Sequence, residues 1–169
     1  MSNINTLRSN QRLIFRIQIT EYRLLKVDFE SKITWKKLTD HLRCSPLFFG
    51  HPRYDGVIYQ KDGDVFAGTA VFGFARLVFV FTISVQEVSY ALALVQRMDI
   101  ANVRRVDRDL SLFRIRTRPK GMFSFIPVRS LVRGAFLFPV PERKSLEFFV
   151  IDAIDADMFV RINEIFANR

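Results

Sequence analysis

The chain has 169 residues, of which 49% are hydrophobic, and this length and composition suit one domain with a substantial core. Eighteen Phe residues against one Trp and four Tyr predict a Phe-rich core, because the Phe ring has no polar tip. The single cysteine, Cys44, excludes an internal disulfide and a multi-cysteine zinc site, and it suits a reducing compartment. The net charge of +9 favours a polyanionic partner, either nucleic acid or an acidic membrane surface.

Residues 1–11 are polar and lack the apolar segment of a signal peptide. We therefore expect a flexible N-terminus that begins near Met1, followed by a single domain over residues 12–169. The apolar run from Val65 to Val85 is long enough for a membrane-spanning helix, but it carries Arg76 near its centre. A central Arg costs at least ~2.5 kcal/mol on insertion scales, so the run predicts two buried strands.

The first half of the chain predicts strands and one accessory helix. Residues 12–29 alternate apolar and polar side chains with a break near Glu21, which indicates two strands. Trp35, Leu38 and Leu42 have the spacing of a short amphipathic helix over residues 34–42, which Ser45 and Pro46 would end. A loop then leads to a strand over residues 57–60 and an Asp-Gly turn.

The second half predicts further strands and a closing helix. Residues 74–83 are apolar at almost every position, as in a strand covered on both faces at the centre of a sheet. Shorter strands are expected at 90–96, 110–116, 122–126, 134–138 and 147–152. Asp155 precedes an apolar stripe typical of a C-terminal helix. The fold class is mainly β, a small, partly open β-barrel with a short accessory helix and a C-terminal α-helix.

The segment from Arg97 to Arg133 concentrates the positive charge, with ten Arg or Lys residues against three Asp. Arg114, Arg116 and Arg118 alternate with uncharged residues, so a strand would put three guanidinium groups on one face, roughly 6.6 Å apart. This pattern favours phosphate contacts, although a charge run is often only a solvated face. The candidate nucleic-acid-binding residues are Arg97, Arg104, Arg105, Arg108, Arg114, Arg116, Arg118 and Lys120.

Two other functions are open on the residues alone. A protein-interaction barrel would use the loop around residues 49–59, with His51, Arg53, Tyr54 and Tyr59 as partner-binding residues. A divergent metal-dependent nuclease would use Asp152, Asp155 and Asp157, but helix capping explains these residues without a metal. A methyl-lysine cage is a weaker alternative, because the Trp and Tyr side chains are scattered along the chain.

Three further residues carry possible chemistry. Arg76, in an apolar strand, is either a buried cation paired with a carboxylate, which we expect, or a groove residue that points to a ligand. His41 and Cys44 lie three residues apart on the predicted helix, which lacks the orienting acid and oxyanion site that cysteine catalysis needs.

Seven segments occur in an order that resembles a known family: YRLLKVDFES, WKKLTDHLRCSPLFFGHPRYDGVIYQ, FARLVFVFTISV, YALALVQRMD, RDLSLFRIR, FSFIPVRSLVRGAFLFP and FVIDAIDADMFVRI. Over roughly residues 22–165 the chain is similar to the C-terminal, non-catalytic region of basidiomycete Kyakuja-Dileera-Zisupton and Plavaka-like transposases. In architecture, the strand pattern also resembles the bromo-adjacent homology domain of chromatin proteins. The resemblance implies a nuclear module that engages DNA or chromatin. It does not extend to the RNase H-like core of such transposases, so it supplies no catalytic residue.

The sequence therefore predicts a non-enzymatic, transposase-derived barrel that binds nucleic acid, DNA in preference to RNA, or a chromatin protein. The protein-interaction alternative is a barrel that binds a histone tail or a transposase partner. We expect a nuclear protein with no cofactor, no metal and no membrane partner.

Overall fold

The computed structural model describes residues 17–66, 69–85, 87–102, 104–118, 122–141 and 146–167. The predicted flexible N-terminus, residues 1–11, and Lys120 lie outside these ranges. Along the described chain the elements are β1 (Ile17–Tyr22), β2 (Leu24–Glu30), β3 (Lys37–Phe48), β4 (His51–Tyr54), β5 (Gly56–Phe66), β6 (Thr69–Val85), β7 (Val88–Ile100), α1 (Arg105–Asp109), β8 (Phe113–Thr117), β9 (Phe123–Pro127), the 3-10 turn η1 (Val128–Ser130), β10 (Leu131–Pro139), β11 (Glu147–Ile151) and α2 (Ala156–Ala167).

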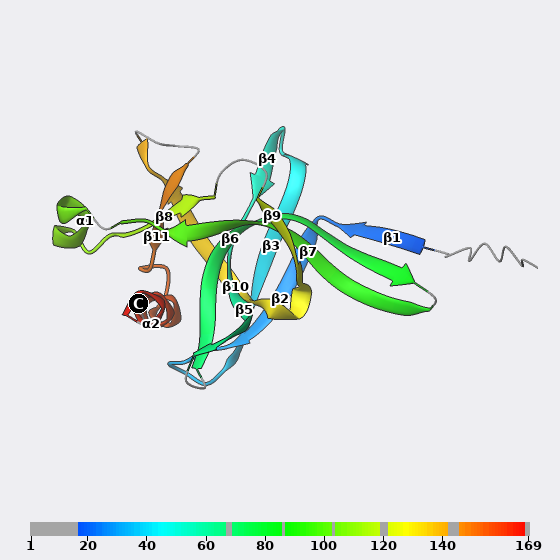
Figure 1. Cartoon of the computed structure of the whole chain (residues 1–169), viewed down its shortest axis with the longest axis horizontal. Coiled ribbons are helices and arrows are strands. Elements are labelled where there is room, and N and C mark those ends of the chain that lie inside the picture. The colour runs from blue at the N-terminus through cyan, green and yellow to red at the C-terminus, as the bar shows by residue number, and fades with distance from the viewer. Residues whose placement is uncertain are drawn as a thin grey trace, which may run out of the picture.

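The fold is mainly β, as predicted, and it is built around one large antiparallel sheet. The pairings run from β6 through β5, β10, β11, β8 and β7, and they return to β6 because β6 also pairs with β7. The outer part of the β6–β7 hairpin continues beyond this ring, with β1 on one side and β9 on the other. Strands β2, β3 and β4 form a second sheet (Figure 1).

Strand β6 lies at the centre of the large sheet, which confirms the prediction for residues 74–83. It pairs with β1, β5 and β7, and its middle section from Gly73 to Ala75 is buried. The apolar run from Val65 to Val85 contributes the end of β5 and the whole of β6, so the prediction of two strands is also confirmed. Within the described chain, neither helix has the length and apolar character needed to cross a membrane.

Two apolar cores lie on opposite faces of the large sheet, because alternate side chains of a strand point to opposite sides. Val57 and Tyr59 of β5 pack with Leu42 and Cys44 of the second sheet. Ile58, between them in sequence, packs in the other core, which α2 closes through Met158 and Ile162. Burial on both faces explains why β5 and β6 have continuous apolar sequences.

The predicted helix over residues 34–42 is wrong. This segment begins with a turn and continues as β3, which pairs with β2 in an antiparallel hairpin. Trp35 lies in the turn with a φ of 57° and Leu38 is 44% exposed, so neither is a core position. Leu42 and Cys44, two residues apart, are the buried pair, and this spacing belongs to a strand. Three apolar residues were too few to distinguish the two periods.

Smaller differences concern two connections. The loop predicted after Phe48 contains β4, joined to β3 by Phe49 and Gly50, both at positive φ. The strand predicted from residue 110 begins later, at Phe113, because helix α1 precedes it. The strands expected at 122–126, 134–138 and 147–152 are present as β9, β10 and β11, and the C-terminal helix is present as α2.

Candidate nucleic-acid interface

The three alternating arginines of β8 have different environments, which corrects the prediction that all three face an external anion. Arg114 is 5% exposed. It donates to both carboxylate oxygens of Asp107 at 2.8 and 2.7 Å, and to Glu147 at 2.8 Å. Hydrogen bonds from Arg114 hold the pKa of Asp107 below its usual range, and the same pair raises the pKa of Arg114. The anions that Arg114 faces are therefore internal.

This buried ion pair positions helix α1. Asp107 lies within α1, and its carboxylate also accepts a bond of 3.4 Å from the backbone N–H of Arg104, just before the helix. A helix of five residues has little stability of its own, so the bonds from Asp107 to β8 hold it in place. The same anchoring leaves Arg105 and Arg108 exposed to solvent.

Exposed guanidinium groups gather around this anchored helix. Arg104, Arg105, Arg108 and Arg116 are exposed and form what we call the basic patch. Arg116 lies opposite Glu147 in the β8–β11 ladder, and Arg104 approaches the same carboxylate at 3.7 Å, which brings α1 and β8 together. No ion pair among the described residues involves Arg105, Arg108 or Arg116. Three of the four cations therefore have no ion pair among the described residues, although Glu147 and Asp99 lie opposite Arg116 in the ladders.

Two more predicted residues border the patch, but they are partly engaged. Arg118 binds Asp99 through three bonds of 2.9 to 3.1 Å, and hydrogen bonding from Asp99 raises its pKa. Arg97 is half-buried with its guanidinium 5.7 Å from the Tyr59 ring centre. Arg97 and Arg118 therefore add to the positive electrostatic potential of the patch, but their N–H groups are less available to a ligand. Lys120 lies outside the described residues.

Aromatic side chains occupy the sheet face beside the patch. Phe149 of β11 lies opposite Arg114 on one side and opposite Phe138 of β10 on the other. Phe138 is 51% exposed, and Phe136, two residues earlier on the same face, is 55% exposed. This outer face thus carries exposed aromatic rings on β10 and the unpaired Arg116 on β8, with β11 between them.

The residues predicted for a partner-binding loop do not lie together on the surface. His51 is exposed on β4. Arg53 donates to Asp55 and lies over the ring of Phe48. Tyr54 is half-buried, whereas Tyr59 is 3% exposed in the core between the two sheets. The prediction is therefore wrong for Tyr59, because the β5 strand turns this side chain inward, and a methyl-lysine cage cannot use it.

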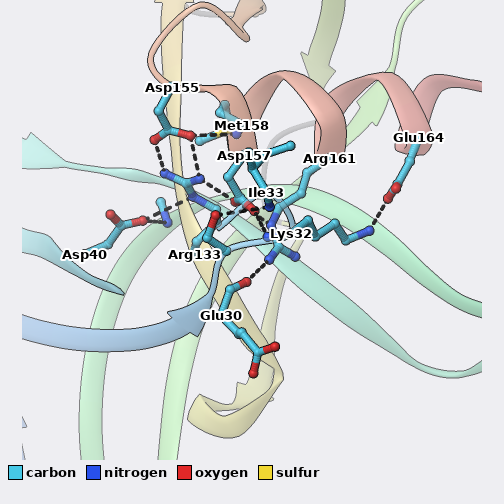
Figure 2. A network of polar contacts seen from close by, with 12 residues as sticks. Glu30, Lys32, Ile33, Asp40, Arg133, Asp155, Asp157, Met158, Arg161 and Glu164 are labelled. Carbon is cyan, nitrogen blue, oxygen red and sulfur yellow. Dashed lines mark hydrogen bonds and ion pairs between the residues drawn. The ribbon is translucent and has the colours of Figure 1, made fainter. Parts of the chain in front are cut away.

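The C-terminal acidic residues form a structural network (Figure 2). Asp155 accepts the backbone N–H of Met158 at 2.7 Å, which confirms its capping role. Arg133, 3% exposed, binds Asp155 at 2.8 Å and Asp157 at 2.7 Å. Asp157 also accepts bonds from Arg161 and from the backbone N–H of Lys32. The network ties α2 to β10 and to the β2–β3 turn.

These contacts bear on the nuclease alternative. The pKa of Asp155 is lowered by its bonds from Arg133, and bonds from Arg161, Lys32 and Arg133 lower the pKa of Asp157 despite its burial. Asp152 is half-buried just after β11. In the ranges that the structure describes, no group of three or more His, Cys, Asp or Glu side chains is arranged to hold a metal ion. Arg133 and Arg161 bind the carboxylates of Asp155 and Asp157.

Arg76 differs from the prediction of a paired cation. It is half-buried, and its guanidinium lies 4.8 Å from the ring centre of Phe148. None of the ion pairs or hydrogen bonds among the described side chains involves it, and burial lowers its pKa. The ladder partners of Arg76, Gly56 of β5 and Gln96 of β7, bring no carboxylate. Its side chain lines a pocket of about 620 Å³.

The two remaining reactive side chains are separated by the strand. His41 is exposed on β3 and Cys44 is 1% exposed, three residues along, so they point to opposite faces. Burial raises the pKa of the Cys44 thiol, which makes it a poor nucleophile.

Sequence reasoning missed the carboxylates that fix the site. Asp107 and Glu147 meet at Arg114 although 40 residues separate them, and Asp40 reaches Arg133 from β3. The one local signal was the placement of Asp107 three residues after Arg104, as in a capping box. A scan against protein-family models and searches of curated proteins and solved structures find no match to this chain.

Proposed function

We propose that this protein is a non-enzymatic nucleic-acid-binding module that contacts phosphates through the basic patch. The observation that supports this most directly is the group of exposed guanidiniums at Arg105, Arg108 and Arg116, which have no ion pairs among the described residues. Arginine forks match phosphate oxygens, and unpaired exposed arginines keep their donors available. The net charge of +9 adds a long-range attraction for a polyanion.

The aromatic rings extend this proposal to unpaired bases. Phe136 and Phe138 are exposed on the sheet face that also carries Arg116. Single-stranded nucleic acid binds to such faces by stacking its bases on aromatic rings while the backbone follows the positive charge, at ~1–3 kcal/mol per stacked base. Duplex DNA would use the phosphate contacts alone.

The wider context belongs to the same proposal. The ring of strand pairings from β6 back to β6 supports a small barrel, and a bromo-adjacent homology-like architecture is one such barrel. Because the ordered segments resemble a region of transposases, the proposal includes a transposase-derived, nuclear module that prefers DNA to RNA.

Fluorescence anisotropy with a labelled duplex and a labelled single strand of equal length tests the proposal. Replacing Arg105, Arg108 and Arg116 together by Gln should weaken binding to both ligands on every sequence. The matched control replaces three exposed lysines by Gln, Lys26 within β2, Lys36 just before β3 and Lys37 at its start, and removes the same charge; Lys37 is paired with Asp28. If both triple variants lose the same affinity, net charge alone explains the binding and the basic patch is not the site. If neither variant loses affinity, the proposal is refuted.

A protein partner is the second candidate, and the β3–β4 hairpin favours it. Phe49 at its tip is 90% exposed and adopts a φ of 48°, a costly conformation for an aromatic residue. Leu47 beside it is 69% exposed. Exposed aromatic residues of this kind are typical anchors in protein interfaces. If Phe49→Ala abolishes binding to a histone-tail peptide while nucleic-acid affinity is unchanged, the protein-partner function is supported. If the peptide binds neither the parent nor the Phe49→Ala variant, that support is lost.

A further inference from the structure

The pocket beside Arg76 is lined by apolar and charged side chains, and among the described lining arginines Arg53 and Arg133 have ion pairs whereas Arg76 has none. Its volume is about 620 Å³, within the range of small-molecule sites. Leu137 of β10, Phe148 of β11 and Ile154, which lies between β11 and α2, line its apolar part, and Arg76 reaches it from the central strand β6. Strands therefore hold Arg76 and most of the apolar wall.

The guanidinium of Arg76 has one described interaction, with the face of the Phe148 ring at 4.8 Å. A cation–π contact of this kind offsets only part of the cost of removing a guanidinium from water. Cations removed from water are normally paired with an anion, as the buried Arg114 and Arg133 are in this protein. Arg133 lines the same pocket, but its guanidinium is bound by Asp155 and Asp157, so Arg76 is the one of these three arginines without an ion pair among the described residues.

The carboxylates in the pocket wall are already engaged elsewhere. Asp55 accepts bonds from Arg53 and from the backbone N–H of Arg43. Asp40 accepts the backbone N–H of Gly134 at 2.9 Å and lies 3.4 Å from Nε of Arg133. These two groups do not neutralise Arg76, but their charge opposes the entry of a highly charged anion. A ligand with one negative charge fits this balance better than a phosphate dianion.

We infer that this pocket binds a small organic monocarboxylate, with its carboxylate on Arg76 and its apolar body against Phe148 and Leu137. Arg76 would donate two parallel N–H bonds to the carboxylate oxygens, a geometry that its planar fork favours. This site is separate from the basic patch and goes beyond the proposed nucleic-acid binding, because it recognises one charge together with an apolar chain.

Isothermal titration with octanoate, octanol and octyl phosphate tests the site. Octanoate should bind the parent, octanol at least tenfold more weakly, and octyl phosphate more weakly than octanoate. Arg76→Met replaces the guanidinium-bearing chain by an unbranched apolar side chain. This variant should bind octanoate at least tenfold more weakly than the parent. Equal octanoate affinity in parent and variant would overturn the inference, as would equal binding of octanol, and tighter binding of octyl phosphate would overturn the assignment of a monocarboxylate.

A measurement on the parent covers the case in which Arg76→Met does not fold. The Nε–H resonance of Arg76 in an NMR titration should shift with octanoate and stay unchanged with octanol; no shift with octanoate would refute the site. The variant that replaces Arg105, Arg108 and Arg116 by Gln should bind octanoate like the parent. This control separates the two proposals, because nucleic-acid binding can be lost while the pocket remains intact.

Discussion

Replacing Arg114 by Met should be far more costly than replacing Arg116, its neighbour on the same face of β8. Arg114→Met removes three bonds of 2.7 to 2.8 Å and leaves Asp107, whose side chain is 3% exposed, without its cation. Breaking a buried ion pair by removing one partner costs about 3–5 kcal/mol. The cation–π contact over Phe149, at 4.8 Å, adds about 0.5–1 kcal/mol.

Glu147 moderates this loss, because Arg104 remains 3.7 Å from its carboxylate. We therefore expect a total near 4 kcal/mol, which for a chain of this size lowers Tm by about 8–16 °C. Arg116→Met, at an exposed position, should change stability by no more than about 0.5 kcal/mol. Urea unfolding followed by circular dichroism measures both variants against the parent.

A double variant strengthens the test. Asp107→Asn removes the buried charge that Arg114→Met leaves without a partner. The two changes together should therefore lower the free energy of unfolding by clearly less than the sum of the single changes. Equal stability of the Arg114→Met and Arg116→Met proteins would refute the buried ion pair and return Arg114 to the surface. Additive losses in the double variant would show that Asp107 and Arg114 do not interact.

Three shorter predictions concern other parts of the fold. Asp155→Ala should lower the free energy of unfolding in urea by about 2 kcal/mol, and Asp155→Asn by about half of that, because Asn keeps the helix cap but loses the ion pair with Arg133. An Asp155→Asn protein as stable as the parent would contradict this, as would a Tm increase with Mg²⁺ in the parent alone. Phe49→Asn should raise stability by about 0.5–1 kcal/mol, since Asn tolerates positive φ, and an unchanged urea midpoint would be evidence against strain at this position. The lowered pKa values of Asp107 and Asp155 place their stabilisation above the unfolded value of about 3.9, so it is lost as the pH falls through the folded values; the urea midpoint should drop between pH 6 and pH 3, and less so in Asp107→Asn.

The strands of the large sheet were predictable because their sequences reflect burial directly. Phe74 to Leu77 pack against cores on both faces, and only a central strand has that environment. The start of α2 and its cap were also predictable, since Asp155 stands directly before the apolar stripe. The β3 strand was not, because Leu38 and Leu42 fit a helix as well as a strand, and pairing with β2 decides between them.

The candidate site was only partly predictable. Alternation placed Arg114 and Arg116 on one face, but the burial of Arg114 depends on Asp107 and on Glu147, which comes from a strand 33 residues further along. Such long-range ion pairs have no local pattern in the sequence. Arg76 shows the opposite case: its apolar surroundings suggested a carboxylate partner, and the fold supplies the ring of Phe148 and a cavity.

The salt dependence of nucleic-acid binding tests the central proposal most directly. The slope of log K against log[salt] for a duplex should be shallower in the variant that replaces Arg105, Arg108 and Arg116 by Gln, by up to ~0.9 for each lost phosphate contact. The control at Lys26, Lys36 and Lys37 should keep the slope of the parent. An unchanged slope in the arginine variant, or the same change in both variants, would contradict phosphate binding by the basic patch.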